Sequence, residues 1–185
     1  MKITGILLTL LLGKCSALVC DEGWKLYDSN GSGMECHPTY QPKGYRKCLK
    51  MFTAKKSWEK AEESCEEKEG NLVKIESKEE NTFLLQEFLI VPEGEQNIEA
   101  WTGLTDKEEE GKFVWTDGQT PSSACTKWAD EQPNDEDGEQ DCAEIANGVF
   151  WPGGEPQIGL WNDFQCHSEL NYICEKGREE YDLSS

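Results

Sequence analysis

The chain has 185 residues, a length suited to one domain, and carries 37 acidic against 18 basic side chains, for a formal net charge of −19. So acidic a chain argues against nucleic acid as a partner. Seven tryptophans and nine cysteines argue against disorder and predict a packed, cross-linked domain.

The first residues predict a signal peptide over residues 1–17. Lys2 precedes the apolar stretch Ile6 to Leu12, and Cys15-Ser16-Ala17 is a small-residue triplet typical of signal peptidase cleavage. The apolar stretch is far shorter than the roughly 20 residues that a membrane span needs, and no later one is longer. The sequence therefore predicts a secreted, extracellular protein with no membrane as partner.

Residues 18–35 predict a short polar N-terminal segment. It contains the sequon Asn30-Gly31-Ser32, which predicts N-glycosylation at Asn30. The stretch from Cys36 to Cys48 then brackets two prolines and a glycine, which indicates a hairpin closed by its own short-range disulfide.

Two helices are predicted next. The first begins near Ser57 and ends at Gly70, with a buried stripe formed by Trp58, Ala61 and Cys65. The second opens with the capping box Ser77-Lys78-Glu79-Glu80 and ends before Pro92. Its predicted buried face consists of Phe83, Leu84 and Phe88.

Short aromatic or β-branched runs after the helices predict strands, at 101–104, 113–115 and 172–174. The long stretch between residues 115 and 172 is rich in Gly, Pro, Asn and Asp. A loop region of that length in a compact domain is normally functional or disordered, and Cys142 and Cys166 lie where a disulfide would pin it.

Residues 130–141 form an acidic loop, with seven carboxylates and three side-chain amides in twelve positions. Only oxygen ligands are present, which favours Ca²⁺ over zinc or copper. The alternative from composition is a solvated acidic surface loop. An EF-hand is excluded because Pro133 would occupy its first ligand position, and structural zinc is disfavoured because His37 and His167 are isolated.

The order of several motifs resembles the C-type lectin-like family from Cys36 to Glu175. These motifs are Trp101-Thr102-Gly103-Leu104, Gln132-Pro133-Asn134, Asp141-Cys142, Trp161-Asn162-Asp163 and Tyr172-Ile173-Cys174-Glu175. The resemblance implies an α+β fold of two helices flanking small antiparallel sheets, with a long Ca²⁺-binding loop region and disulfide staples. We expect this domain to occupy residues 36–176 and to be followed by a polar tail, 177–185.

The resemblance implies three disulfides, Cys36–Cys48, Cys65–Cys174 and Cys142–Cys166. Cys20 and Cys125 are left over. They either pair as a fourth bridge or join a second chain, and the sequence leaves both alternatives open.

Two Ca²⁺ sites are also implied by the resemblance. The auxiliary site would use Asp106, Glu110, Asp135 and Asp141. The principal site, where the ion coordinates two sugar hydroxyls directly, would use Gln132, Asn134, Gln140, Asn162 and Asp163, with a cis peptide bond between Gln132 and Pro133.

The principal site departs from the family pattern in two ways. Gln140 stands where the family usually has Glu, which removes a negative charge that the neighbouring Glu139 would have to replace. The triplet at Gln132 is a hybrid of the family's mannose-type Glu-Pro-Asn and galactose-type Gln-Pro-Asp, so the sugar class stays undecided. Trp151 is a candidate for stacking on a sugar, or an ordinary packed aromatic, and Trp161 is expected in the core.

The sequence thus predicts a secreted Ca²⁺-dependent lectin that binds mannose- or galactose-type sugars on glycans. The alternative is a module of the same fold that binds no sugar, either an acidic matrix or mineral-associated protein or a protein-binding module with structural Ca²⁺ alone. An enzyme is not expected, since neither histidine lies in a recognisable catalytic setting. A single sugar site binds weakly, so a homo-oligomer would raise avidity.

Overall fold

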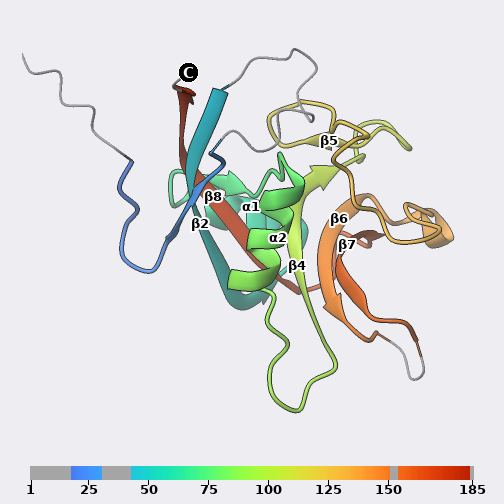
Figure 1. Ribbon diagram of the computed structural model, residues 1–185. Coiled ribbons are helices and arrows are strands. Elements are labelled where there is room, and N and C mark those ends of the chain that lie inside the picture. Colours follow the sequence, from blue (N-terminus) through green and yellow to red (C-terminus); the bar gives the residue numbers. More distant parts are fainter. Residues whose placement is uncertain (1–17, 31–42, 151–153, 184–185) are drawn as a thin grey trace, which may run out of the picture.

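The computed structural model describes residues 18–30, 43–150 and 154–183 (Figure 1). Its helices are α1 (Trp58–Glu66), α2 (Lys78–Glu87) and the 3-10 turn η2 (Glu136–Gly138). Its strands are β1 (Lys25–Asp28), β2 (Lys43–Lys56), β3 (Asn71–Leu72), β4 (Asn97–Thr105), β5 (Val114–Trp115), β6 (Cys142–Gly148), β7 (Gln157–Phe164) and β8 (Leu170–Asp182). Within the described residues, no helix is long and apolar enough to cross a membrane.

Both helices follow from the sequence signals. Ser57 is the N-cap residue of α1, and the predicted stripe of this helix is buried. In α2 the Ser77 Oγ accepts a hydrogen bond from the backbone N–H of Glu80 at 2.9 Å, as the capping box predicts. The Glu80 side chain departs from that motif: it turns inward and accepts from the backbone N–H of Glu76 at 2.9 Å.

The strands form one mixed sheet in the order β1-β2-β8-β4-β6-β7, with β3 beside β8 and β5 beside β4. All of its strand pairs are antiparallel except β4 with β8, which run parallel over two residue pairs. This short parallel contact joins what the sequence predicts as separate small sheets. The α+β class with two helices is confirmed.

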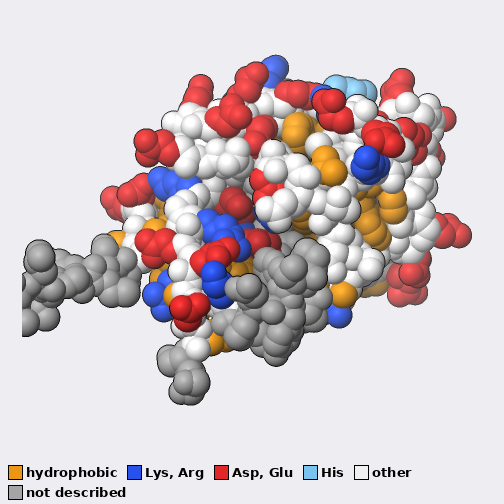
Figure 2. All heavy atoms as spheres, turned by 90° about the horizontal axis from the view of Figure 1, so that it is seen from above, with side chains coloured by type: hydrophobic (Ala, Val, Ile, Leu, Met, Phe, Trp, Pro, Cys, Tyr) orange, Lys and Arg blue, Asp and Glu red, His pale blue; other side chains and the backbone are white. Residues whose placement is uncertain are grey.

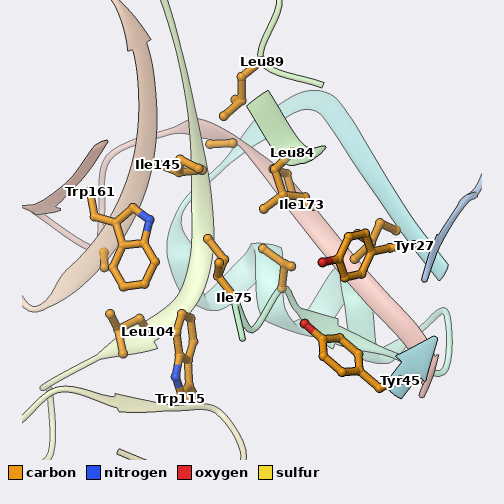
Figure 3. Close-up of a cluster of buried hydrophobic side chains, with 14 residues drawn as sticks. Tyr27, Tyr45, Ile75, Leu84, Leu89, Leu104, Trp115, Ile145, Trp161 and Ile173 are labelled. Atoms are coloured by element: carbon orange, nitrogen blue, oxygen red, sulfur yellow. The ribbon is translucent and has the colours of Figure 1, made fainter. Parts of the chain in front are cut away.

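The core lies between this sheet and α2, and a second buried cluster lies under α1. Figure 3 shows Trp161, Trp115 and Leu104 at one end of the first cluster and Tyr27 and Tyr45 at the other. Trp161 is 1% exposed and its Nε1 donates to Asn81 Oδ1 at 2.7 Å, which ties β7 to α2. The residue that precedes the predicted Asn162-Asp163 ligand pair is therefore fixed in the core.

Three disulfides join described cysteines: Cys20–Cys48, Cys65–Cys174 and Cys142–Cys166. The last two are pairs that the resemblance implied, whereas the predicted Cys36–Cys48 pair is wrong. Cys48 lies inside the 14-residue strand β2 and not at the foot of a hairpin, and β1 pairs alongside it, with Leu26 opposite Cys48. The N-terminal segment thereby brings the Cys20 Cα within 5.5 Å of the Cys48 Cα. The alternative Cys20–Cys125 pair is also wrong, and Cys125 is itself disulfide-bonded.

The sheet extends beyond the predicted domain limits at both ends. β1 belongs to the segment predicted to precede the domain, yet it pairs with β2. β8 continues through most of the predicted polar tail, where Asp182 lies opposite Lys43. Backbone pairing with β2 orders both segments, even though their side chains are largely polar.

Candidate functional site

Three segments bring the predicted site residues together: the turn that follows β4, the loop from residue 116 to 141 between β5 and β6, and strand β7. In Figure 1 the loop runs from yellow to orange and lies beside β6 and β7. The backbone N–H of Ala129 donates to the Trp161 carbonyl at 2.8 Å, which anchors the loop to β7. The Gln132–Pro133 peptide bond is cis.

Asp163 holds the loop in place through hydrogen bonds to its backbone. This residue is 1% exposed, and its Oδ2 accepts from the backbone N–H groups of Asn134 at 2.9 Å and Asp135 at 2.7 Å. Hydrogen bonds from two N–H groups to one carboxylate oxygen are charge-assisted and strong. Asp163 therefore fixes the segment that carries Asn134 against the end of β7.

Four predicted ligands, Gln132, Asn134, Gln140 and Asn162, line one cavity of about 420 Å³. The backbone N–H of Glu136 lies 3.0 Å from Gln140 Oε1 and 3.2 Å from Asn134 Oδ1. The two amide oxygens thus converge on one donor, although they are separated by five loop residues.

Two oxygens of the predicted principal set are buried without a hydrogen-bond partner, Gln132 Oε1 and Asp163 Oδ1. Burial of an unpaired polar atom is costly, and a carboxylate oxygen costs more than an amide oxygen. A hard cation that accepts oxygen ligands would relieve both penalties. The donor set therefore fits Ca²⁺.

The second predicted cation site is an acidic cluster. Asp106, Glu110 and Asp141 each place a carboxylate oxygen within 4.8 Å of the others. Burial raises the pKa of Asp106 to about 6, and the nearby Glu110 and Asp141 charges add to the rise. Asp106 Oδ2 accepts from the backbone N–H of Gly111 at 2.9 Å, but its Oδ1 is buried without a partner. A buried carboxylate oxygen without a hydrogen-bond partner, next to other acidic side chains, also fits a divalent cation.

The remaining predicted site residues are placed differently. Asp135 is not in the acidic cluster; its Oδ1 accepts from the backbone N–H of Gln140 at 3.1 Å and so braces the loop internally. Glu139 is exposed. Trp151 lies outside the described residues.

Comparison with known proteins decides the family. The model of the Lectin C-type domain matches residues 54–176, which is more than half of the chain. The chain belongs to the C-type lectin domain family. This is a family of binding domains and not of enzymes. The chain is 32% identical over 130 residues to hepatic lectin from Gallus gallus, a match that covers 70% of this chain and 55% of that relative. It thus spans about half the length of that protein.

Solved C-type lectin domains share the fold. The mouse scavenger receptor C-type lectin carbohydrate-recognition domain matches with a TM-score of 0.59 and 31% identity, over 86% of this chain and 98% of that one. The cow C-type carbohydrate-recognition domain of CD23, solved in the presence of a GlcNAc2Man3 oligosaccharide, matches with a TM-score of 0.60 and 28% identity, over 85% and 95% of the two chains.

Sequence reasoning missed Glu144 in this lectin domain. Glu144 lines the same cavity, is 4% exposed, and its Oε1 accepts from Asn162 Nδ2 at 3.1 Å. Burial raises the pKa of Glu144 to about 8, and the neighbouring Glu99 carboxylate adds to the rise. The signal that was available is strand alternation: Ala143 and Ile145 face the core cluster, so Glu144 points to the opposite face of β6.

Proposed function

We propose that this C-type lectin domain binds sugars through a Ca²⁺ ion held by Gln132, Asn134, Gln140, Asn162 and Asp163. The observation that carries the proposal is convergence: residues from the loop and from β7 line one cavity, and the neighbouring Asp163, which holds the Asn134 backbone, keeps one buried carboxylate oxygen without a hydrogen-bond partner. Every donor in the set is an oxygen, as Ca²⁺ prefers.

The chemistry of sugar recognition follows from these residue types. When bound, Ca²⁺ supplies open coordination positions for two neighbouring sugar hydroxyls. Asn134 and Asn162 present amides that both donate and accept hydrogen bonds, so they can pair with the same hydroxyls. Their amide orientation is constrained by Glu136 N–H on one side and Glu144 on the other, which pre-organises the site.

A second Ca²⁺ ion would lie at Asp106, Glu110 and Asp141 and stabilise the loop. Asp106 N–H donates to the Asp141 carbonyl at 3.1 Å, and Thr105 Oγ1 donates to the same carbonyl at 2.7 Å. The cluster therefore joins the end of β4 to the start of β6. An ion there would act as a cross-link between two segments of the loop region.

The sugar is of mannose or galactose type. The hybrid Gln132-Pro133-Asn134 triplet matches neither family pattern, and Gln140 leaves Asp163 as the one carboxylate in the principal set. Related proteins are named as hepatic lectin and as C-type mannose receptor 2, which supports glycans as the ligand class.

We further propose that the protein acts outside the cell. The three disulfides suit an oxidising compartment, and Asn30 is exposed on a turn after β1, as a glycosylation acceptor must be. A related solved structure is titled as a trimer, the Kupffer cell C-type lectin receptor Clec4f, so clustering of sites in a homo-oligomer would supply avidity here as well.

The test is retention of the protein on mannose-, galactose- and N-acetylgalactosamine-coated surfaces, first in Ca²⁺ and then in EDTA. We expect retention in Ca²⁺ on at least one surface and release by EDTA. The informative variants are Asn162→Ala and Asp163→Asn, because Asp163→Asn keeps an acceptor for the Asn134 N–H but removes the negative charge. Both should abolish retention.

Gln86→Ala is the matched control, since it removes an exposed amide from α2, outside the cavity. It should leave retention unchanged. Absence of retention on all three surfaces, or retention that persists in EDTA, contradicts the proposal.

Two observations favour a second candidate, a lectin-like module with structural Ca²⁺ but no sugar ligand. The neutral Gln140 is engaged by the Glu136 N–H, and acidic side chains are spread around the rim of the face in Figure 2. Calorimetry separates the two: Ca²⁺ uptake that is lost in Asp106→Asn, without retention on any sugar surface, would support this candidate.

A further inference from the structure

The ligand cavity extends beyond the proposed Ca²⁺ ligands, along the ladder between β6 and β7. Two positions before Asn162 on β7 is Leu160, which pairs with Ala146 of β6. Further along the ladder, Gln157 lies opposite Gly148. Leu160, Ala146 and Gln157 all line the cavity. Since a strand rises about 3.3 Å per residue, Gln157 lies on the order of 15 Å from Asn162. The cavity is therefore longer than a single sugar ring.

This extension is apolar where it leaves the proposed ion site. Its wall is formed by Ala146, Phe150 and Leu160, which we call the apolar wall. Ala146 is 4% exposed, whereas Phe150 and Leu160 are half-buried. Neither Phe150 nor Leu160 packs against the two core clusters of the described residues. Their exposed surface therefore stays in contact with water until a ligand covers it, and covering it is favourable.

The polar and charged groups around the apolar wall limit what can bind there. Among the described residues that line the cavity, none is Lys, Arg or His. A phosphate or carboxylate on a ligand would therefore meet acidic side chains without a cation. At the far end, Gln157 Oε1 is buried without a hydrogen-bond partner, so the apolar stretch ends there at a polar atom. These limits favour an uncharged chain of a few carbon atoms.

Resting on the proposed function, we propose that the apolar wall is a subsite for an uncharged alkyl or acyl chain carried by the ion-bound sugar. Such a chain leaves the ring either from the glycosidic oxygen or as an ester on a ring hydroxyl, and in both cases it lays methylene groups on Ala146, Phe150 and Leu160. Leu160 is a specificity-determining residue, because it lies between the proposed ligand Asn162 and the far end of the cavity.

The experiment compares matched glycosides by calorimetric titration of the Ca²⁺-loaded protein. The galactose and mannose series each contain the methyl glycoside, the hexyl glycoside and the 2-(2-hydroxyethoxy)ethyl glycoside, whose chain is as long as hexyl but polar. In the series whose hydroxyls suit the ion, we expect the hexyl glycoside to bind about tenfold more tightly than the methyl glycoside, the gain from burying about two methylene groups. The polar chain should bind like methyl.

A fourth compound in each series distinguishes the two attachments. It is the methyl glycoside with a hexanoyl ester on the 6-hydroxyl. A tenfold gain for either the hexyl glycoside or this ester supports the subsite, and the compound that shows the gain identifies where the chain leaves the ring.

Two variants test the apolar wall in different ways, and the quantity measured in each is the ratio of hexyl to methyl affinity. Leu160→Asn replaces the apolar side chain by a polar one, whereas Ala146→Leu stays apolar but fills the space. Both should lower the ratio from about ten to about one. Ile158→Asn is the matched control, because Ile158 lies on the same strand, is 58% exposed and does not line the cavity. It should keep the full ratio.

The outcomes separate the subsite from the proposed function. If methyl glycosides bind in a Ca²⁺-dependent manner but neither chain adds affinity, or if the polar chain adds as much as hexyl, the subsite is wrong and the proposed function stands. A gain that persists in both Leu160→Asn and Ala146→Leu overturns the assignment to the apolar wall. If no compound in either series binds the Ca²⁺-loaded protein, the proposed function fails and the subsite fails with it.

Discussion

Two regions of this lectin domain bury carboxylates, and they differ in what neutralises them. Beneath the β1–β2 end of the sheet, Lys47 Nζ lies 2.7 Å from Glu80 Oε1, 2.6 Å from Glu175 Oε2 and 3.5 Å from Glu76 Oε2. The Lys47 and Glu80 side chains are fully buried. Arg178 adds a second cation, with its Nε and Nη2 each 3.1 Å from the Glu76 carboxylate. We call these five residues the Lys47 cluster.

At the ligand cavity and the acidic cluster, no described Lys or Arg plays this part. Asp106, Glu144 and Asp163 are at most 4% exposed, and each leaves one oxygen without a hydrogen-bond partner. No ion pair joins any of the three to a described Lys or Arg. The same domain therefore neutralises buried acids from within at one end and leaves them without an internal cation at the other, as the proposed Ca²⁺ sites would require. That contrast supports the proposal that ligands bind at the loop end.

The largest effect is expected from Lys47→Met. Removing the lysine leaves three carboxylates without their common cation, and breaking a buried ion pair on one side costs about 3–5 kcal/mol. Urea unfolding monitored by tryptophan fluorescence measures the change in unfolding free energy. Lys43→Met, which breaks an exposed pair with Glu180, should cost at most about 1 kcal/mol. Equal losses in the two variants would show that the Lys47 cluster is not a stabilising unit.

The pH dependence of stability tests the same cluster. Burial raises the pKa of Glu76, but the charges of Lys47 and Arg178 outweigh it and hold the pKa at about 2, against an ordinary value of 4.5. Because this folded-state pKa is depressed, its contribution of about 3 kcal/mol is present above about pH 4.5 and is lost as pH falls toward 2. The contribution of Glu80 to stability depends on pH in the opposite direction. Burial raises the pKa of Glu80 to about 7, so this contribution is lost as pH rises from about 4.5 to 7.

A variant at Glu76 isolates the contribution of this residue to the pH dependence of stability. Between pH 5 and 2, about where Glu76 titrates, Glu76→Gln should lose less unfolding free energy than the wild type in urea titrations at stepped pH. Exposed Glu93→Gln should follow the wild-type curve. Identical curves for Glu76→Gln and the wild type would mean that Glu76 is not stabilised by its two cations in the folded state.

Local patterns in the sequence were enough to predict the loop region that carries the cavity, but not the Lys47 cluster. The order of short motifs predicts the family and the loop region, because each motif spans a few adjacent residues. The three acids Asp106, Glu110 and Asp141 could be grouped only through the resemblance, since Glu110 and Asp141 are 31 positions apart in the sequence. Glu144 escaped prediction because its role depends on the register that sets it opposite Asn162.

The Lys47 cluster was not predicted at all. Its members come from β2, the segment before α2, α2 itself and β8, and Lys47 and Glu175 are 128 positions apart. The wrong Cys36–Cys48 pair has a related cause: nearness in sequence was taken for nearness in space, whereas β2 is extended and its neighbour at Cys48 is β1. Pairing across the sheet is set by tertiary contacts that local patterns do not encode.

The smallest effect is expected from Gln140→Glu, a change at the cavity. Gln140→Glu adds one carboxylate to the cavity that lacks a cation, at the position where the family usually has an acid. Because Ca²⁺ affinity rises with the number of charged ligands, the principal site should bind Ca²⁺ about tenfold more tightly, or about 1.4 kcal/mol. Without Ca²⁺ the variant should be less stable than the wild type, since Gln140 is 5% exposed and the new charge would lie near Asp163. Gln86→Glu adds the same charge on an exposed turn of α2 and should change neither quantity. Calorimetric titration measures the Ca²⁺ affinity. If Gln140→Glu leaves this affinity unchanged, residue 140 is not a ligand, and the proposal that a Ca²⁺ ion neutralises the cavity is contradicted.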